Sequence, residues 1–85
     1  MTYYEAALQV LRSARRPLTT QEITDLAMER KLIIPRGKTP HATMSAVLYQ
    51  RVRDDPELVK LGVEGNERAK RGSVRWALRP REGHL

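Results

Sequence analysis

Cysteine and phenylalanine are absent from this sequence, and its aromatic side chains are limited to Tyr3, Tyr4, Tyr49 and Trp76. Without cysteine, a disulfide scaffold, a zinc finger with cysteine ligands and a thiol nucleophile are all excluded. Binding of RNA or single-stranded DNA usually needs exposed aromatic rings on which bases stack, and the sequence offers few. We therefore rank that class of function low.

No apolar stretch approaches the ~20 residues that span a bilayer, and the N-terminus has no signal-peptide core. We expect a soluble protein without membrane contact, cytoplasmic (nucleoid-associated) if bacterial and nuclear if eukaryotic. With 85 residues the chain has room for one domain and none for a large enzyme cleft between lobes. We assign residues 1–79 to this domain and residues 80–85 to a flexible tail.

The charge is unevenly distributed. Apolar residues make up 40% and charged residues 31%, which is typical of a folded domain, and the formal net charge is +6. Residues 68–85 hold six basic groups and one acidic group, a net +5. Twelve of the sixteen basic residues are Arg, whose guanidinium pairs well with phosphate. Most of the positive surplus is therefore C-terminal and suited to an anionic partner.

Two helix starts are marked by capping boxes, in which a Thr side chain and a Glu three residues later satisfy free backbone N–H groups. The pair Thr2 and Glu5 predicts a helix from about residue 3 to 13, which Pro17 prevents from continuing. The pair Thr19 and Glu22 predicts a second helix that ends near residue 31. Flanking apolar residues at 18 and 23 form a hydrophobic staple there. Residues 32–34 are expected to be extended.

Residues 35–38, Pro-Arg-Gly-Lys, have the composition of a turn. Thr39 and Pro40 then predict a helix cap with Pro in the first position of a third helix, from 40 to about 53. Helical spacing places Met44, Val47, Leu48 and Val52 on one side and Ala42, Ala46, Gln50 and Arg53 on the other. Arg51 falls on the apolar side, so either its stem packs along the core edge or the helix phase is slightly different.

After Pro56 the apolar period changes from 3.6 to 2. Val59, Leu61 and Val63 alternate with polar or small residues, and Val74, Trp76 and Leu78 do the same. These two strands are expected to pair as a hairpin around a loop at 64–72. Trp76 is predicted to be the largest core side chain.

Three short helices followed by a hairpin indicate an α+β fold, a winged helix-turn-helix with a two-stranded wing. A helix of about 10–12 Å diameter fits the major groove of DNA, and a basic hairpin loop can follow the neighbouring backbone. Basic residues lie at both places. Double-stranded DNA is therefore the expected partner, and we expect a monomeric domain of a larger protein.

The chain resembles the HARE-HTH domain family, winged helices found in chromatin regulators, certain restriction endonucleases and the delta subunit of bacterial RNA polymerase. Three stretches carry the likeness: residues 6–11 followed by Arg16-Pro17-Leu18, then Glu22-Ile23-Thr24 with Ala27, and above all Gly37-Lys38-Thr39-Pro40 with Ala42-Thr43 and Leu48-Tyr49. The closing Trp76-Ala77-Leu78 also resembles the final strand of the family. The wing of this chain is longer and more basic than the family pattern. The resemblance implies DNA binding or attachment to transcription or chromatin proteins, in gene regulation or restriction.

From the residues themselves, the candidate DNA contacts are the polar and basic side chains around the third helix and the wing. Gln50 could pair with adenine and Arg53 with guanine, whereas His41 could donate to a phosphate or base edge. Tyr49 is expected at the core edge, and the wing cluster is the strongest candidate. The full set is Arg36, Lys38, Thr39, His41, Thr43, Ser45, Gln50, Arg53, Arg68, Lys70, Arg71 and Arg75.

Other functions find less support. Gly37-Lys38-Thr39 resembles the end of a phosphate-binding loop, but position 32 is Leu where that motif has its first Gly. No cofactor, metal site or catalytic constellation is indicated, so we do not expect an enzyme. The alternative to DNA binding is an adaptor that docks on RNA polymerase or chromatin factors. It is favoured by the acidic residues Asp54, Asp55 and Glu57, which would repel DNA if they lay beside the third helix.

Overall fold

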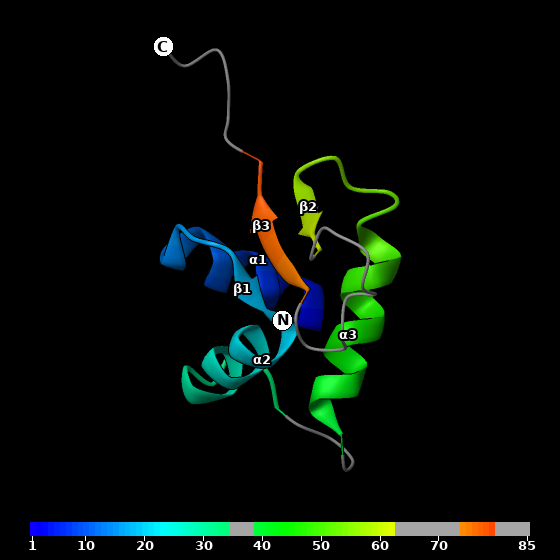
Figure 1. Ribbon diagram of the computed structural model, residues 1–85. Coiled ribbons are helices and arrows are strands. Elements are labelled where there is room, and N and C mark those ends of the chain that lie inside the picture. Colours follow the sequence, from blue (N-terminus) through cyan, green and yellow to red (C-terminus); the bar gives the residue numbers. More distant parts are fainter. Residues whose placement is uncertain (35–38, 63–73, 80–85) are drawn as a thin grey trace.

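The computed structural model describes residues 1–34, 39–62 and 74–79. These contain three helices and a small antiparallel sheet, an α+β winged helix (Figure 1). The helices are α1 (Tyr3–Ala14), α2 (Thr20–Glu29) and α3 (Pro40–Arg51). The strands are β1 (Leu18–Thr19), β2 (Leu58–Leu61) and β3 (Arg75–Leu78). The fold class predicted from the sequence is confirmed.

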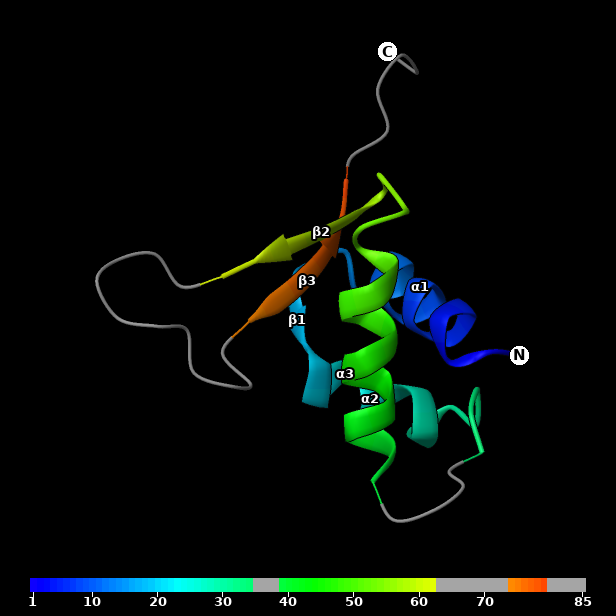
Figure 2. The ribbon, with the colours of Figure 1, turned by 90° about the vertical axis from the view of Figure 1, so that its right-hand side faces the viewer.

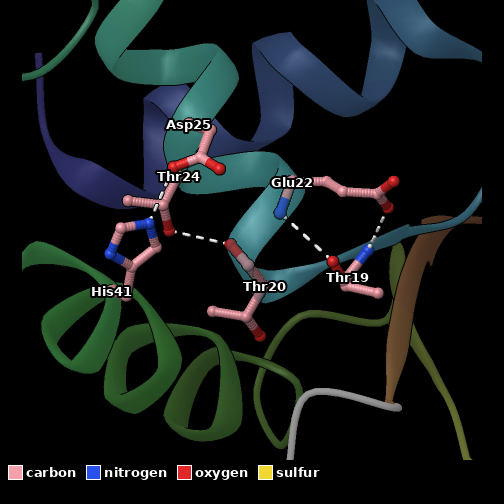
Figure 3. Close-up of polar contacts among 6 residues, drawn as sticks. All are labelled: Thr19, Thr20, Glu22, Thr24, Asp25 and His41. Atoms are coloured by element: carbon pink, nitrogen blue, oxygen red, sulfur yellow. Dashed lines mark hydrogen bonds and ion pairs between the residues drawn. The ribbon is translucent and has the colours of Figure 1, made fainter.

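Both predicted capping boxes form. The Thr2 hydroxyl accepts from the backbone N–H of Glu5 at 3.0 Å, while the Glu5 carboxylate accepts from the N–H of Thr2. Thr19 and Glu22 repeat this exchange at the start of α2, at 3.1 and 2.9 Å (Figure 3). Each box satisfies two N–H groups that the first helical turn leaves free. The sequence therefore determines where these two helices begin.

The second and third helices end slightly earlier than predicted. α2 ends at Glu29, because Lys31 adopts a left-handed conformation with φ 59°. α3 ends at Arg51, and Arg53 lies in the turn that follows. Residues 32 and 33 form bends, and residues 32–34 form no strand. The predicted turn at 35–38, the loop at 64–72, Val63 and the tail at 80–85 lie outside the described residues.

The sheet has one strand more than the predicted hairpin. β1 and β2 both pair antiparallel with β3, in the order β1-β3-β2 (Figure 2). Leu18 lies opposite Trp76 and Thr19 opposite Arg75. A strand of two residues, the second of which is the cap of α2, carries no alternating pattern, so no local signal indicated β1. This strand attaches the start of α2 to the wing.

The predicted orientation of β2 was wrong by one residue. Leu58 is buried and lies opposite Leu78, and Lys60 lies opposite Trp76. Directly opposed residues in an antiparallel pair point to the same face, so Leu58 and Lys60 point toward the helices. Val59 and Leu61 occupy the outer face, where Leu61 is 42% exposed. The prediction had Val59 and Leu61 inward and Lys60 outward.

The core lies between the three helices and the inner face of the sheet. Trp76 is fully buried, as predicted, together with Leu18, Ile23, Met44 and Leu48. Its indole N–H donates to the Thr20 hydroxyl at 2.9 Å, so the one polar atom of the ring is satisfied. Within the described part of the chain, no helix has the length and apolar character that crossing a membrane requires. This core fixes α3 against α1, α2 and β3.

Candidate nucleic-acid interface

α3 presents one face to solvent, and Figure 2 shows it on the near side of the molecule. Met44 and Leu48 are buried, and Val47 and Val52 are partly buried, which confirms the predicted inner face. The opposite face carries no charged side chain between Thr39 and Gln50. Arg53, just beyond the end of the helix, is the first charged residue on it. Its exposed residues are Thr39, Ala42, Thr43, Ala46, Tyr49, Gln50 and Arg53. Small side chains at 42 and 46 allow another surface to approach the helix closely.

The start of α3 differs in one respect from the prediction. Pro40 occupies the first helical turn as expected, but the Thr39 side chain makes no capping hydrogen bond. Only the Thr39 carbonyl is used, accepting from the backbone N–H of Thr43 at 3.2 Å. Backbone N–H groups at this terminus are therefore not satisfied by the Thr39 hydroxyl. Exposed N–H groups at a helix start favour an anion such as phosphate.

His41 contacts α2 across the helix-turn-helix. Its Nε2 lies 2.8 Å from Oδ1 of Asp25, and the two side chains are 44% and 54% exposed (Figure 3). The contact joins the first turn of α3 to the middle of α2. His41 therefore has a protein partner that the sequence prediction did not include.

A groove separates the N-terminal part of α2 from α3. Predicted contacts His41 and Ser45 line it together, whereas Thr43 and Gln50 lie on other parts of the exposed face. The remaining lining residues come from α2, α3 and the start of β3: Thr20, Gln21, Ala42, Ala46, Tyr49 and Val74. The groove is open to solvent and combines hydroxyl, amide and small apolar groups. Such a surface suits contact with an extended polar partner.

Lys60 places a cation on the helix-facing side of the sheet, next to the ring of Tyr49. The Lys60 ammonium lies 5.3 Å from the centroid of the Tyr49 ring, a cation–π contact. The same ring meets Trp76 edge-on at 5.0 Å between centroids. Tyr49 is 41% exposed, so it lies at the core edge as predicted. It holds Lys60 beside α3, at the wing end of the groove.

The C-terminal end of α3 is built around Tyr4. The Arg51 guanidinium lies 5.1 Å from the Tyr4 ring centroid, which explains why an exposed Arg falls on the apolar side of the helix. The Tyr4 hydroxyl donates to Asp55 Oδ2 at 2.5 Å, and Asp55 also accepts from the backbone N–H of Glu57. The hydrogen bond from Tyr4, followed by that from Glu57, lowers the pKa of the Asp55 carboxyl. Burial, with the hydrogen bond to Asp55 as a second cause, raises the pKa of the Tyr4 phenol.

The acidic residues Asp54, Asp55 and Glu57, which favoured protein docking, differ in their surroundings. Asp55 is directed to α1, where its carboxylate accepts the hydrogen bond from the Tyr4 hydroxyl. Asp54 and Glu57 remain exposed, beside the last turn of α3 and about 18 Å along the helix from its first turn. Any repulsion of phosphate is therefore concentrated at that end.

Arg75 occupies a different surface from α3. Side chains alternate along a strand, and Trp76 is directed into the core, so Arg75 points to the outer face of the sheet. Its strand partners are Thr19 and Leu61. The sequence prediction listed Arg75 among the contacts of the third helix and the wing, and its alternation with Trp76 already placed it opposite the apolar face of the strand. Five predicted contacts lie outside the described residues: Arg36, Lys38, Arg68, Lys70 and Arg71.

Three groups on the α3 side were missed by the sequence prediction: Lys60, Gln21 and Asp25. Lys60 could have been found from the burial of Leu58, because the two are at positions i and i+2 of the strand and share a face. Gln21 and Asp25 lie one helical turn apart on the polar side of α2, which the prediction treated only as a core-forming helix. Among the described residues, no group of three His, Asp or Glu side chains is arranged to hold a metal ion.

Comparison with known protein families identifies a match over most of the chain. The model of the HARE-HTH family, described as a helix-turn-helix domain of ASXL proteins and restriction endonucleases, matches residues 1–65. This span contains all three helices, β1 and β2. No curated protein and no solved structure matches the chain. The resemblance inferred from the sequence is thereby confirmed.

Proposed function

The chain belongs to the HARE-HTH family, and on that premise we propose that it is a DNA-binding accessory module that places α3 at the major groove of double-stranded DNA. The family is a helix-turn-helix family to which DNA binding is ascribed, and it is not a catalytic family. The observation that carries the proposal is the solvent-facing side of α3, with small residues at 42 and 46 flanked by Thr43 and Gln50. These allow the helix backbone to approach base edges.

Phosphate contacts would come from several directions. The N–H groups at the start of α3 are not capped by Thr39, and Lys60 lies near its exposed side. The basic wing residues Arg68, Lys70 and Arg71 are proposed to bind the adjoining backbone, together with Arg36 and Lys38 before α3. Phosphate contacts are largely independent of base sequence. Most of the affinity would therefore be shared by all duplexes, and discrimination between base sequences would be weak.

A salt titration with a short duplex tests this proposal. If about 4 to 6 phosphates are neutralised, the slope of log K against log salt is about −4 to −5. Absence of binding at low salt would contradict the proposal, and so would a response that does not change with salt. Replacing Arg68, Lys70 and Arg71 by Ala should weaken binding to every duplex, and unchanged affinity would remove the wing from the interface.

Docking on a transcription or chromatin protein is the second candidate. The exposed carboxylates of Asp54 and Glu57, next to the end of α3, favour it because they oppose close phosphate contact there. NMR titration separates the two functions. Shifts at Ala42, Ala46 and Gln50 on adding duplex DNA support DNA binding. No shift with DNA, combined with a response to a transcription protein, supports docking.

A further inference from the structure

The pair formed by His41 and Asp25 is the only ion pair within residues 1–34, 39–62 and 74–79. It lies between the two helices of the helix-turn-helix, and His41 also lines the groove beside α3. Most surface ion pairs contribute little to stability, and this one is about half exposed. The pair is therefore expected to matter more for DNA binding, because of its position beside the groove, than for the stability of the fold.

The geometry determines which nitrogen of His41 is free. An ionised carboxylate only accepts hydrogen bonds, so Nε2, which faces Asp25, carries a hydrogen. In the neutral ring, Nδ1 is then an acceptor. Taking up a proton from solvent places the hydrogen on Nδ1 and makes the ring a donor on both sides. Only this protonated form can hold Asp25 and a phosphate oxygen at the same time.

Among the described residues, few other charged side chains lie near His41. On α3, no charged side chain other than His41 occurs before Arg51. On α2, the next acidic residue toward the C-terminus is Glu29, one turn beyond Asp25. On the sheet, Lys60 is directed to Tyr49, and Arg75 lies on the outer face. Within the part of the chain that the structure describes, Asp25 is therefore the charged group that directly faces His41.

We propose that the His41–Asp25 pair makes DNA binding proton-linked, with His41 taking up a proton as the duplex binds. This inference rests on the proposed function and adds a regulation to the same site. With neutral His41, the pair carries the charge of the Asp25 carboxylate and repels phosphate. With protonated His41, the pair has no net charge and offers an N–H donor. Histidine is the side chain whose charge ordinarily changes between about pH 5 and 8.

Duplex affinity measured from about pH 8 to pH 6, at fixed ionic strength, tests the inference. Binding should tighten as the pH falls, by about threefold to tenfold per pH unit, because uptake of one proton sets a limit of tenfold. Ionic strength must be constant because the phosphate contacts depend on salt. Calorimetry in two buffers of different ionisation enthalpy should detect the same proton directly.

Three variants locate the effect. H41Q should flatten the pH dependence of duplex affinity, because glutamine takes up no proton between pH 6 and pH 8. D25N should bind more tightly at pH 8, because the repelling carboxylate is gone, and should show a weaker pH dependence. His84 is the only other histidine, so H84Q is the matched control and should retain the full pH dependence. Circular dichroism confirms that each variant is folded.

The outcomes separate this inference from the proposed function. Binding that is salt-dependent but insensitive to pH would overturn the proton linkage and leave DNA binding intact. A pH dependence that persists in H41Q, or disappears in H84Q, would also overturn it. No binding at low salt at any pH would overturn both. Loss of the pH dependence in H41Q alone supports the assignment.

Discussion

The indole N–H of Trp76 donates to the hydroxyl of Thr20 across 2.9 Å, which joins the middle of β3 to the first residue of α2. β1 makes a second connection at the same place, because Leu18 lies opposite Trp76. The wing and the helix-turn-helix are thus attached at one point of the core. A change at Thr20 should therefore affect the stability of the whole domain.

Replacing Thr20 by Val should destabilise the protein by about 1 kcal/mol. The variant keeps the shape of the side chain but leaves the N–H of a fully buried Trp76 without its acceptor. Urea unfolding followed by tryptophan fluorescence measures the effect, since Trp76 is the only tryptophan. T39V is the matched control, because Thr39 is exposed and its side chain makes no capping hydrogen bond, and its midpoint should be unchanged. Equal midpoints for T20V and the unchanged protein would argue against the role of this hydrogen bond.

Much of the fold was predictable because its signals are local. Thr19 with Glu22 identifies the start of α2 from side-chain chemistry alone, and the spacing of Met44 and Leu48 identifies the buried face of α3. β1 was not predictable, because a two-residue strand exists only through its pairing with β3. The inward side of β2 was misassigned for a related reason. Leu58 and Val59 are both apolar, and only the register with β3 decides between them.

The candidate site was less predictable than the fold. The exposed face of α3 follows from helical periodicity, so Ala42, Ala46 and Gln50 were placed correctly. His41 and Asp25 are 16 residues apart, and no periodic pattern relates two helices joined by a turn. The outer position of Arg75 follows from strand alternation with Trp76 and was predictable, whereas its neighbours Thr19 and Leu61 are set by the pairing of β3 with β1 and β2. Contacts between elements depend on packing that the sequence does not express locally.

The hydrogen bond between Tyr4 and Asp55 should make stability depend on pH at the acid end. The pKa of the Asp55 carboxyl is lowered in the folded protein, chiefly by the Tyr4 hydroxyl. A lowered folded-state pKa stabilises the protein above the unfolded value of about 4, and this is lost as the pH falls through the folded-state value. In Y4F the urea midpoint should be lower at pH 7 and should change less between pH 5 and pH 2.

Acid titration alone cannot assign this effect to Asp55, because the hydrogen bond from Thr2 also lowers the pKa of the Glu5 carboxyl. The variant Y3F is the control, since Tyr3 neighbours Tyr4 in α1 and makes no such contact with Asp55. Y3F should keep the acid response of the unchanged protein. If Y4F and Y3F respond alike, the Tyr4 hydroxyl is not the cause.

Arg15 ends α1 in a left-handed conformation, with φ 58°. A residue with a β-carbon is strained there, whereas Gly is not. R15G should therefore stabilise the protein by about 0.5–1 kcal/mol, measured by urea or thermal unfolding. R16G is the matched control: Arg16 has no positive φ, so the added chain freedom should destabilise. A lower midpoint for R15G would contradict this interpretation of the helix end.

Lys60 should contribute one phosphate contact to DNA binding, because Tyr49 holds its ammonium beside α3. K60A should weaken binding to all duplexes by a similar factor and reduce the salt slope by about 1. Y49L, which removes the ring beneath the ammonium, should weaken binding less, since the charge remains. R12A removes an equal charge from α1 and serves as the control, with the slope expected to be unchanged. If K60A and R12A lower affinity equally, the effect is one of overall charge, and Lys60 is not a contact.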